Sequence, residues 1–206
     1  MKGKLFNSMV TSPPHNFARV MNYPENQEKL YIFDFTQGYD PDFIRTKAWG
    51  IGRYNEKRSN MYVAPQYEDV RNIHMGIDIW TSPGSPVFSF TEGEVVYLQD
   101  NDQNGDYGPT IVIRYYLSDH IYFALYGHLS RSSLQEVDVG EQIDPGQQIA
   151  KIGTEEVNGG WAPHLHFQLA KEDPGEADMP GVVASASRAG ALQQYPDPRR
   201  VLGNLY

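Results

Sequence analysis

Two histidines separated by a single residue, His164 and His166, are the first candidates for chemistry in this chain. In an extended strand, residues two apart point to the same side, so both imidazoles would share one face while Leu165 and Phe167 turn toward the packed side. Two imidazoles on one surface can hold a metal together, or one can hold it while the other transfers a proton. Glycine and proline in residues 159–163 indicate a shaped loop before the strand, a common location for functional groups. Two polar positions on a solvent face are the alternative.

A second pair of candidate ligands, His74 and Asp78, is separated by three residues. The neighbouring isoleucines and Gly76 are poor helix material, and in a straight strand the two side chains would lie about 13 Å apart, too far to share one ion. A glycine tolerates the conformations that a bend requires. If both residues are ligands, the sequence therefore predicts that the chain turns at Gly76; otherwise they are an exposed histidine and an aspartate in a turn.

A third histidine, His128, ends the apolar run of residues 121–127. Taken alone, such a histidine is usually a partly buried side chain with a satisfied hydrogen bond. The chain contains no cysteine, so any metal in it must be held by His, Asp or Glu. The three histidine segments together therefore form the candidate site.

Strands are the elements predicted to position these residues. From residue 61 onward, short β-branched and aromatic runs alternate with turn residues, which is the pattern of an all-β domain. Residues 110–116 and 121–128 are predicted to form an antiparallel pair across Ser118 and Asp119. Residues 165–169 are predicted to be the last strand, before a loop-rich tail.

Residues 1–60 are predicted to be an N-terminal extension to a domain of residues 61–206. Several prolines near the start favour an irregular arm, while Asp40 followed by Pro41 is typical of a helix start and predicts one short helix toward Lys47. Residues 50–58 carry several charges and are predicted to be a solvated connection, with a binding loop as the alternative.

Composition limits the possible partners. The formal net charge is −9 and no cluster of Lys and Arg is present, which argues against binding to nucleic acid. No stretch is long and apolar enough to span a bilayer, so no membrane association is expected. The first residues lack the apolar run of a signal peptide, and a cytoplasmic location is the expectation.

The three segments in order, H-M-G-I-D at residues 74–78, Y-G-H-L-S at 126–130 and H-L-H-F at 164–167, closely resemble the lysostaphin/LytM-type zinc metalloendopeptidases. Those enzymes cut peptide cross-links in peptidoglycan, and the resemblance covers roughly residues 73–169. It implies an all-β fold, with a β-sandwich-like core of antiparallel sheets and a groove that binds a peptide or peptidoglycan-type substrate.

By this resemblance His74, Asp78 and His166 hold Zn²⁺, and His128 and His164 are the catalytic histidines. Two imidazoles and one carboxylate would leave a fourth position for water, as in a catalytic rather than a structural zinc site. No H-E-x-x-H motif supplies a glutamate, so a histidine must be the base, and strand geometry places His164 beside His166. His128 would donate to the oxyanion.

Two aromatic residues, Tyr126 and Trp161, are predicted to line the groove, with ordinary packing as an equal alternative. His15 and His120 stand in no motif and are predicted not to be ligands.

A narrower likeness involves the segments G-I-G-R-Y, Y-G-P-T-I, Y-G-H-L-S and V-N-G-G-W-A-P-H-L-H-F-Q. They resemble the peptidase-type module found between a kinase-like phosphotransferase and a PLP aminotransferase in some large bacterial fusions. This chain contains neither of those partners.

Two alternatives to a peptidoglycan endopeptidase follow. One is a cytoplasmic zinc hydrolase acting on a non-wall amide or peptide, which the acidic charge and the lack of a leader favour. The other is a non-catalytic LytM-like module that activates other enzymes. Such modules have typically lost metal-site residues, so the complete set in this chain argues against it.

Overall fold

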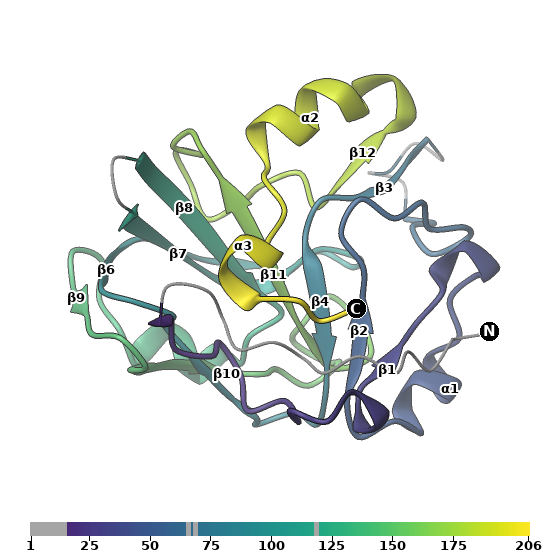
Figure 1. Cartoon of the computed structure of the whole chain (residues 1–206), viewed down its shortest axis with the longest axis horizontal. Coiled ribbons are helices and arrows are strands. Elements are labelled where there is room, and N and C mark those ends of the chain that lie inside the picture. Colours follow the sequence, from purple (N-terminus) through teal and green to yellow (C-terminus); the bar gives the residue numbers. More distant parts are fainter. Residues whose placement is uncertain (1–15, 65–66, 68–69, 118–119) are drawn as a thin grey trace.

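A mixed sheet of eight strands forms the centre of the computed structural model, which describes residues 16–64, 67, 70–117 and 120–206 (Figure 1). Across the sheet the strands are β1 (Tyr31–Ile32), β2 (Gly50–Gly52), β4 (Ile77–Trp80), β11 (His164–Ala170), β8 (His120–Gly127), β7 (Gly108–Leu117), β6 (Gly93–Asn101) and β9 (Gln142–Ile143). Neighbouring strands are antiparallel except β1 and β2, which are parallel. The predicted all-β fold is confirmed, with this one parallel pair added.

Two small sheets and a few short helices surround the large sheet. The small sheets pair β5 (Pro86–Phe88) with β10 (Gln148–Lys151), and β3 (Arg71–His74) with β12 (Val182–Ala184). The helices are α1 (Pro41–Arg45), α2 (Arg188–Gln194) and α3 (Arg199–Leu202), with 3-10 turns at Gln27–Lys29, Phe35–Gln37, Arg131–Gln135 and Ser185–Ser187. In the part of the chain that is described, no helix has the length and apolar character needed to cross a membrane.

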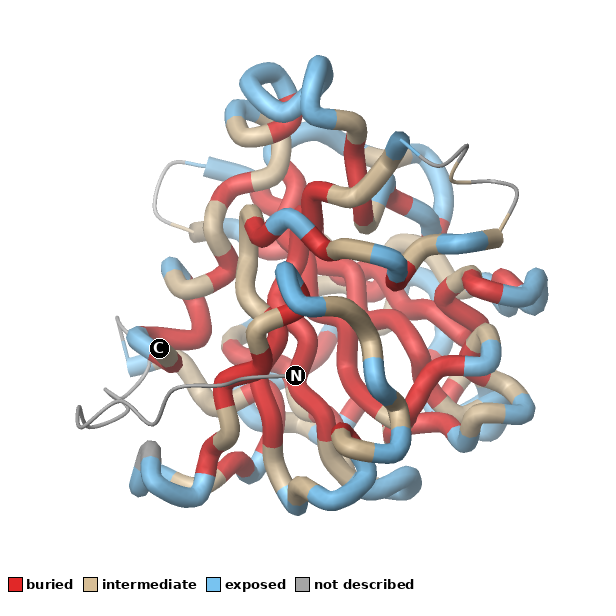
Figure 2. Tube along the Cα trace, turned by 90° about the vertical axis from the view of Figure 1, so that its right-hand side faces the viewer, coloured by how far each residue is buried: buried red, intermediate tan, exposed pale blue. Residues whose placement is uncertain are grey.

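Both faces of the large sheet are covered by side chains. Along β7, Ile111 and Ile113 point into the main core, whereas Val112 between them packs in a separate cluster on the other face with Leu125. This alternation is the period-2 pattern of a strand. Figure 2 shows the consequence, with buried residues (red) at the centre and exposed residues (pale blue) at the periphery.

The predicted antiparallel pair is present as β7 and β8, whose register ends at Leu117 opposite His120. The predicted turn at residues 118–119 lies outside the described residues. The neighbouring pair β4 and β11 is buried along its whole length. Its register sets Asp78 opposite His166, so two candidate ligands from distant segments become direct neighbours.

The first part of the chain contributes to the sheet. The helix predicted after Asp40 is α1, and the Asp40 side chain accepts a hydrogen bond from the Phe43 amide at 3.0 Å. Strands β1 and β2 extend the large sheet beyond β4. The domain boundary at residue 60 stays a prediction.

The prediction that residues 50–58 form a solvated connection is wrong. Residues 50–52 are strand β2, and Arg58 is 1% exposed. Glycine is needed in β2 because rings lie against its backbone. A Cβ on Gly50 would stand 2.2 Å from Phe33 Cε2, and one on Gly52 would stand 2.6 Å from Trp80 Cζ3. Gly50 and Gly52 are therefore required by close packing against aromatic rings, whereas the sequence pattern had predicted a loop.

The tail after β11 is also more ordered than predicted, because it contains β12, α2 and α3. β12 pairs with β3 so that Val182 lies opposite His74, and the Met75 amide donates to the Gly181 carbonyl at 2.9 Å. The tail thereby holds the first ligand segment in place, with α2 beyond it in Figure 1.

Candidate metal centre and catalytic cleft

Three predicted ligands meet at one point between β3, β4 and β11. His74 Nε2 lies 3.1 Å from His166 Nδ1 and 3.2 Å from Asp78 Oδ1, and His166 Nδ1 lies 2.9 Å from the same oxygen. The predicted turn at Gly76 is confirmed, because β3 ends at His74 and β4 begins at Ile77. The turn brings Asp78 back to His74 across three residues.

The other nitrogen of each ligand ring has its own acceptor. His74 Nδ1 lies 2.9 Å from the carbonyl oxygen of Arg53, and His166 Nε2 lies 3.0 Å from Gln168 Oε1. Each ring donates its N–H to that oxygen and turns an unprotonated nitrogen toward the centre. Metal-binding histidines are typically fixed in this way.

Charge states at the centre agree with this arrangement. Burial raises the pKa of Asp78, but the positive charge of Arg58, which donates to Oδ2 at 2.6 Å, is the largest opposing effect, and the pKa of this carboxyl is held well below its usual range. Burial, followed by the nearby charge of Arg58, lowers the pKa of His74 to about 3. The carboxylate is therefore ionised and the His74 imidazole neutral, which are the forms that bind metals.

These residues fit a zinc ion. Two ring nitrogens and one carboxylate oxygen converge without a proton between them, and a shared cation relieves that repulsion. Zinc bonds of about 2.0–2.2 Å place the ligand atoms of a tetrahedral site about 3.3–3.6 Å apart. The three separations, 2.9, 3.1 and 3.2 Å, are shorter by a few tenths of an ångström.

The two predicted catalytic histidines lie next to this centre. His164 is stacked on Trp80 at 4.6 Å between ring centroids, and its Nδ1 lies 2.7 Å from the Ala162 carbonyl oxygen. Its Nε2 consequently faces Asp78 Oδ1, at 3.9 Å. Burial lowers the pKa of His164 to about 4, against the opposing charge of Asp78.

The His128 ring lies 4.2 Å from the His164 ring. Its Nδ1 lies 2.9 Å from the carbonyl oxygen of Asn158, so Nε2 is the nitrogen left for the cleft. Burial, then the charge of His164, holds the pKa of His128 well below its usual range. His128 also has a φ of +64°, a left-handed conformation that is costly for a residue other than glycine. Such strain is often found at functional sites.

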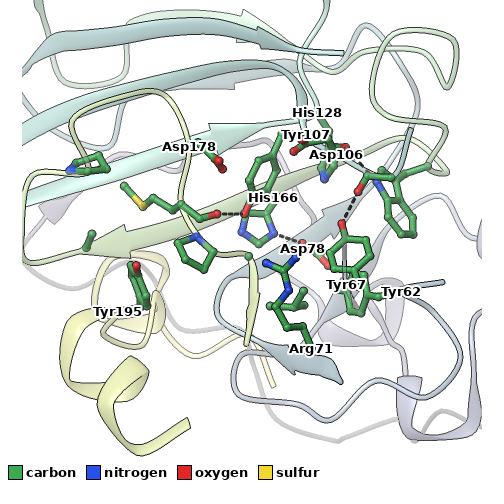
Figure 3. Close-up of a pocket in the computed structure, with 18 of the residues that line it drawn as sticks. Tyr62, Tyr67, Arg71, Asp78, Asp106, Tyr107, His128, His166, Asp178 and Tyr195 are labelled. Atoms are coloured by element: carbon green, nitrogen blue, oxygen red, sulfur yellow. Dashed lines mark hydrogen bonds and ion pairs between the residues drawn. The ribbon is translucent and has the colours of Figure 1, made fainter. Parts of the chain in front are cut away.

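A cleft of about 490 Å³ opens onto the centre (Figure 3). Asp78, His128, His164 and His166 line it, together with Trp161, as predicted. Figure 3 shows His166 beside Asp78, with Tyr107 and His128 on the same side of the cleft.

The prediction that Tyr126 lines the groove is wrong. Tyr126 is fully buried in the main core, and its hydroxyl lies 2.7 Å from that of Tyr115. Period-2 alternation would place Tyr126 and His128 on one face, but β8 ends at Gly127 and the left-handed backbone of His128 breaks the alternation. His120, at the start of β8, is exposed and outside the cluster, and His15 lies outside the described residues.

Sequence reasoning missed several residues of the site. Arg58 contacts two of the ligands, Gln168 orients His166, and Tyr107 packs against His166 at 5.1 Å between ring centroids. Tyr107 and Gln168 stand in the segments Y-G-P and H-L-H-F-Q, next to residues that were considered. For Arg58, the only signal in the sequence was that its segment, residues 50–58, carries several charges.

The comparison with protein families agrees with the geometry. The model of peptidase family M23 matches residues 72–179, more than half of the chain. The chain therefore belongs to peptidase family M23.

Individual relatives share part of the chain. The peptidoglycan DD-endopeptidase ShyB of Vibrio cholerae is 31% identical over 112 residues, which are 52% of this chain and 24% of ShyB. ShyC of the same organism, also a peptidoglycan DD-endopeptidase, is 29% identical over 121 residues, 56% of this chain and 25% of ShyC. The chain thus spans about a quarter of the length of these two relatives.

A lipoprotein and a solved structure complete the comparison. The lipoprotein NlpD of Yersinia enterocolitica is 32% identical over 92 residues, 45% of this chain and 84% of NlpD. The catalytic domain of lysostaphin from Staphylococcus simulans superposes with a TM-score of 0.49 at 21% identity, covering 81% of this chain and 99% of that domain.

Proposed function

We propose that this chain is a zinc-dependent metalloendopeptidase that hydrolyses peptide bonds in peptidoglycan-type peptides. The observation that carries the proposal is the convergence of the acceptor atoms of His74, Asp78 and His166 beside two further histidines of the cleft. Membership of peptidase family M23 supports the reaction class. The substrate class is supported by the names of ShyB and ShyC.

In this proposal His74, Asp78 and His166 hold the zinc. When bound, zinc supplies a Lewis acid that polarises a carbonyl group and lowers the pKa of water toward about 7. His164 Nε2 faces the same point and takes a proton from the attacking water, while the Ala162 carbonyl oxygen fixes its ring. His128 Nδ1 already donates to the Asn158 carbonyl oxygen, so the ring must take up a second proton, on Nε2, to donate to the substrate carbonyl oxygen; the negative charge that this oxygen gains stabilises that proton.

The narrower likeness to the module of phosphotransferase–aminotransferase fusions remains part of the proposal. It rests on the four sequence segments alone. This likeness indicates no particular substrate. The alternative, a substrate outside the cell wall, is favoured by the net charge of −9, because an acidic protein is not attracted to an anionic surface. The assay of function must therefore offer both kinds of substrate.

Zinc content and cleavage are measured on the same preparation. We expect about one zinc per chain by elemental analysis, and cleavage of an amide bond in sacculi, muropeptides or short peptides, read by mass spectrometry. A chelator should remove the zinc and stop cleavage, and added zinc should restore it. Cleavage of short peptides alone would select the non-wall hydrolase. Stoichiometric zinc with no cleavage of any substrate would instead favour the non-catalytic module.

A methyl group at Gly76 should disturb the zinc site. A Cβ there would stand 2.5 Å from His166 Cε1 and 2.6 Å from its Nε2, so the ring must move away from its position beside Gln168. We expect Gly76→Ala to weaken zinc binding about tenfold or more, the effect typical of losing a contact that orients a ligand. Competition with a chromophoric chelator measures this affinity.

The matched control is Gly190→Ala in α2, where a Cβ meets no atom within 4 Å. It should bind zinc as the unmodified chain does. An unchanged affinity in Gly76→Ala would show that His166 does not depend on the space that this glycine leaves.

A further inference from the structure

One buried arginine reaches the candidate metal centre from the first part of the chain. The Arg58 side chain is 1% exposed, and its guanidinium carbon lies 4.8 Å from the centre of the Phe35 ring and 5.9 Å from that of Trp80. Nη1 also donates to the Tyr62 hydroxyl at 2.8 Å. A charged side chain is rarely placed so deep without a specific partner.

Its main partner is a candidate metal ligand. Arg58 Nη1 donates to Asp78 Oδ2 at 2.6 Å, while Asp78 Oδ1 faces the two ligand nitrogens of His74 and His166. The carboxylate is thus divided, with one oxygen held by the guanidinium and the other directed at the centre. Arg58 Nη2 also lies 2.9 Å from His74 Nδ1.

Arg58 is itself held by further charges. Glu56 Oε2 faces Arg58 Nε at 3.7 Å, and neither atom has a hydrogen-bond partner among the described residues. The other oxygen of Glu56 accepts from Arg53 Nε at 2.9 Å, and Arg53 Nη2 lies 3.4 Å from Asp34 Oδ1. Alternating charges therefore run from Asp34 at the edge of the molecule to Asp78 at the centre.

The segment of residues 53–58, which contains Arg53, Glu56 and Arg58, also fixes the ligand His74, because the Arg53 carbonyl oxygen accepts a hydrogen bond from His74 Nδ1. This segment lies outside residues 72–179, the part that matches the family model. The N-terminal part of the chain, before the matched residues, therefore supplies these contacts to the metal ligands.

From this geometry we propose that Arg58 is a positioning residue, which makes Asp78 a one-oxygen metal ligand by holding Oδ2 away from the centre. This inference rests on the proposed zinc site. A carboxylate that offers a single oxygen keeps the fourth position of a four-coordinate ion open for water or substrate. With Oδ2 released, Asp78 could rotate, offer both oxygens, or lose its place at the centre.

The test compares Arg58→Met and Arg58→Lys with the unmodified chain. Methionine keeps much of the length between Phe35 and Trp80 without charge, and lysine keeps a charge that can reach Oδ2. We expect Arg58→Met to weaken zinc binding about 10- to 100-fold, as for loss of a group that orients a metal ligand. Arg58→Lys should recover part of that affinity.

A spectroscopic readout separates positioning from a general structural effect. With Co²⁺ in place of zinc, a four-coordinate site absorbs visible light strongly, and a site of higher coordination absorbs weakly. We expect Arg58→Met to change the intensity of these bands, with Arg58→Lys closer to the unmodified chain. The control is Arg114→Met, which removes another arginine–carboxylate pair, 2.6 Å from Glu94 on the same sheet, and should change neither readout.

The outcomes distinguish this inference from the proposed function. An unmodified chain that binds no zinc contradicts the proposed site. Zinc in the unmodified chain, with unchanged affinity and cobalt spectrum in Arg58→Met, contradicts the positioning role of Arg58. Should Arg58→Met fail to fold, as shown by circular dichroism, Arg58→Gln takes its place as the uncharged variant, and an unchanged affinity and spectrum in Arg58→Gln would contradict the inference. Equal losses of zinc affinity in Arg58→Met and Arg58→Lys would show that a positive charge at Asp78 Oδ2 does not position this ligand, which also contradicts the inference.

Discussion

Replacing either cleft histidine with alanine should remove most of the activity and leave the zinc bound. His164→Ala takes away the group proposed to accept the proton of the attacking water, and a general base contributes about 10²–10⁴ in rate. His128→Ala takes away the proposed donor to the oxyanion, which is worth about 10²–10³. Neither Nε2 belongs to the three atoms that converge at the centre, so the zinc content should stay near one per chain.

Rates on a cleaved peptide, measured beside the zinc content of each preparation, test this expectation. His120→Ala is the control, because His120 is exposed at the start of β8 and outside the cluster. It should keep both zinc and rate. A His164→Ala variant with an undiminished rate would show that another group is the base.

Replacing a metal ligand should remove the zinc, in contrast to replacing His128 or His164, which should leave it bound. His74→Ala, Asp78→Ala and His166→Ala each leave two protein donors, so zinc should be lost on dialysis and activity with it. A metal present at about a thousand times its Kd stabilises the folded state by about 4 kcal/mol. Added zinc should therefore raise the melting temperature of the unmodified chain and have no such effect on these variants. If one of these variants keeps its zinc, the residue replaced in it is not a ligand.

Local pattern was sufficient to predict the parts of the site that lie on regular elements. Alternation along residues 164–167 placed His164 and His166 on one face, and both line the cleft. Gly76 was predicted to turn the chain because no straight strand could bring Asp78 to His74, and β3 and β4 are separated there. These inferences depend only on strand geometry and on the conformational freedom of glycine.

Other parts of the site depend on contacts that no local pattern records. The glycines of β2 resemble a loop until Phe33 and Trp80 are seen to pack against them. Arg58 lies 20 residues before Asp78 along the chain, so nothing in its own segment identifies that partner. Tyr126 was predicted to line the groove, but the left-handed backbone of His128 breaks the strand alternation there, and Tyr126 is buried in the main core.

Zinc analysis of His164→Ala and His166→Ala in parallel is the most direct test of the central claim. The two residues are neighbours on β11, and they differ in the nitrogen that each directs at the centre and in the partner of the other nitrogen. We predict about one zinc per chain in His164→Ala and almost none in His166→Ala. The reverse result would exchange the roles of ligand and base. Full zinc in both variants would show that β11 does not bind the metal, which contradicts the account.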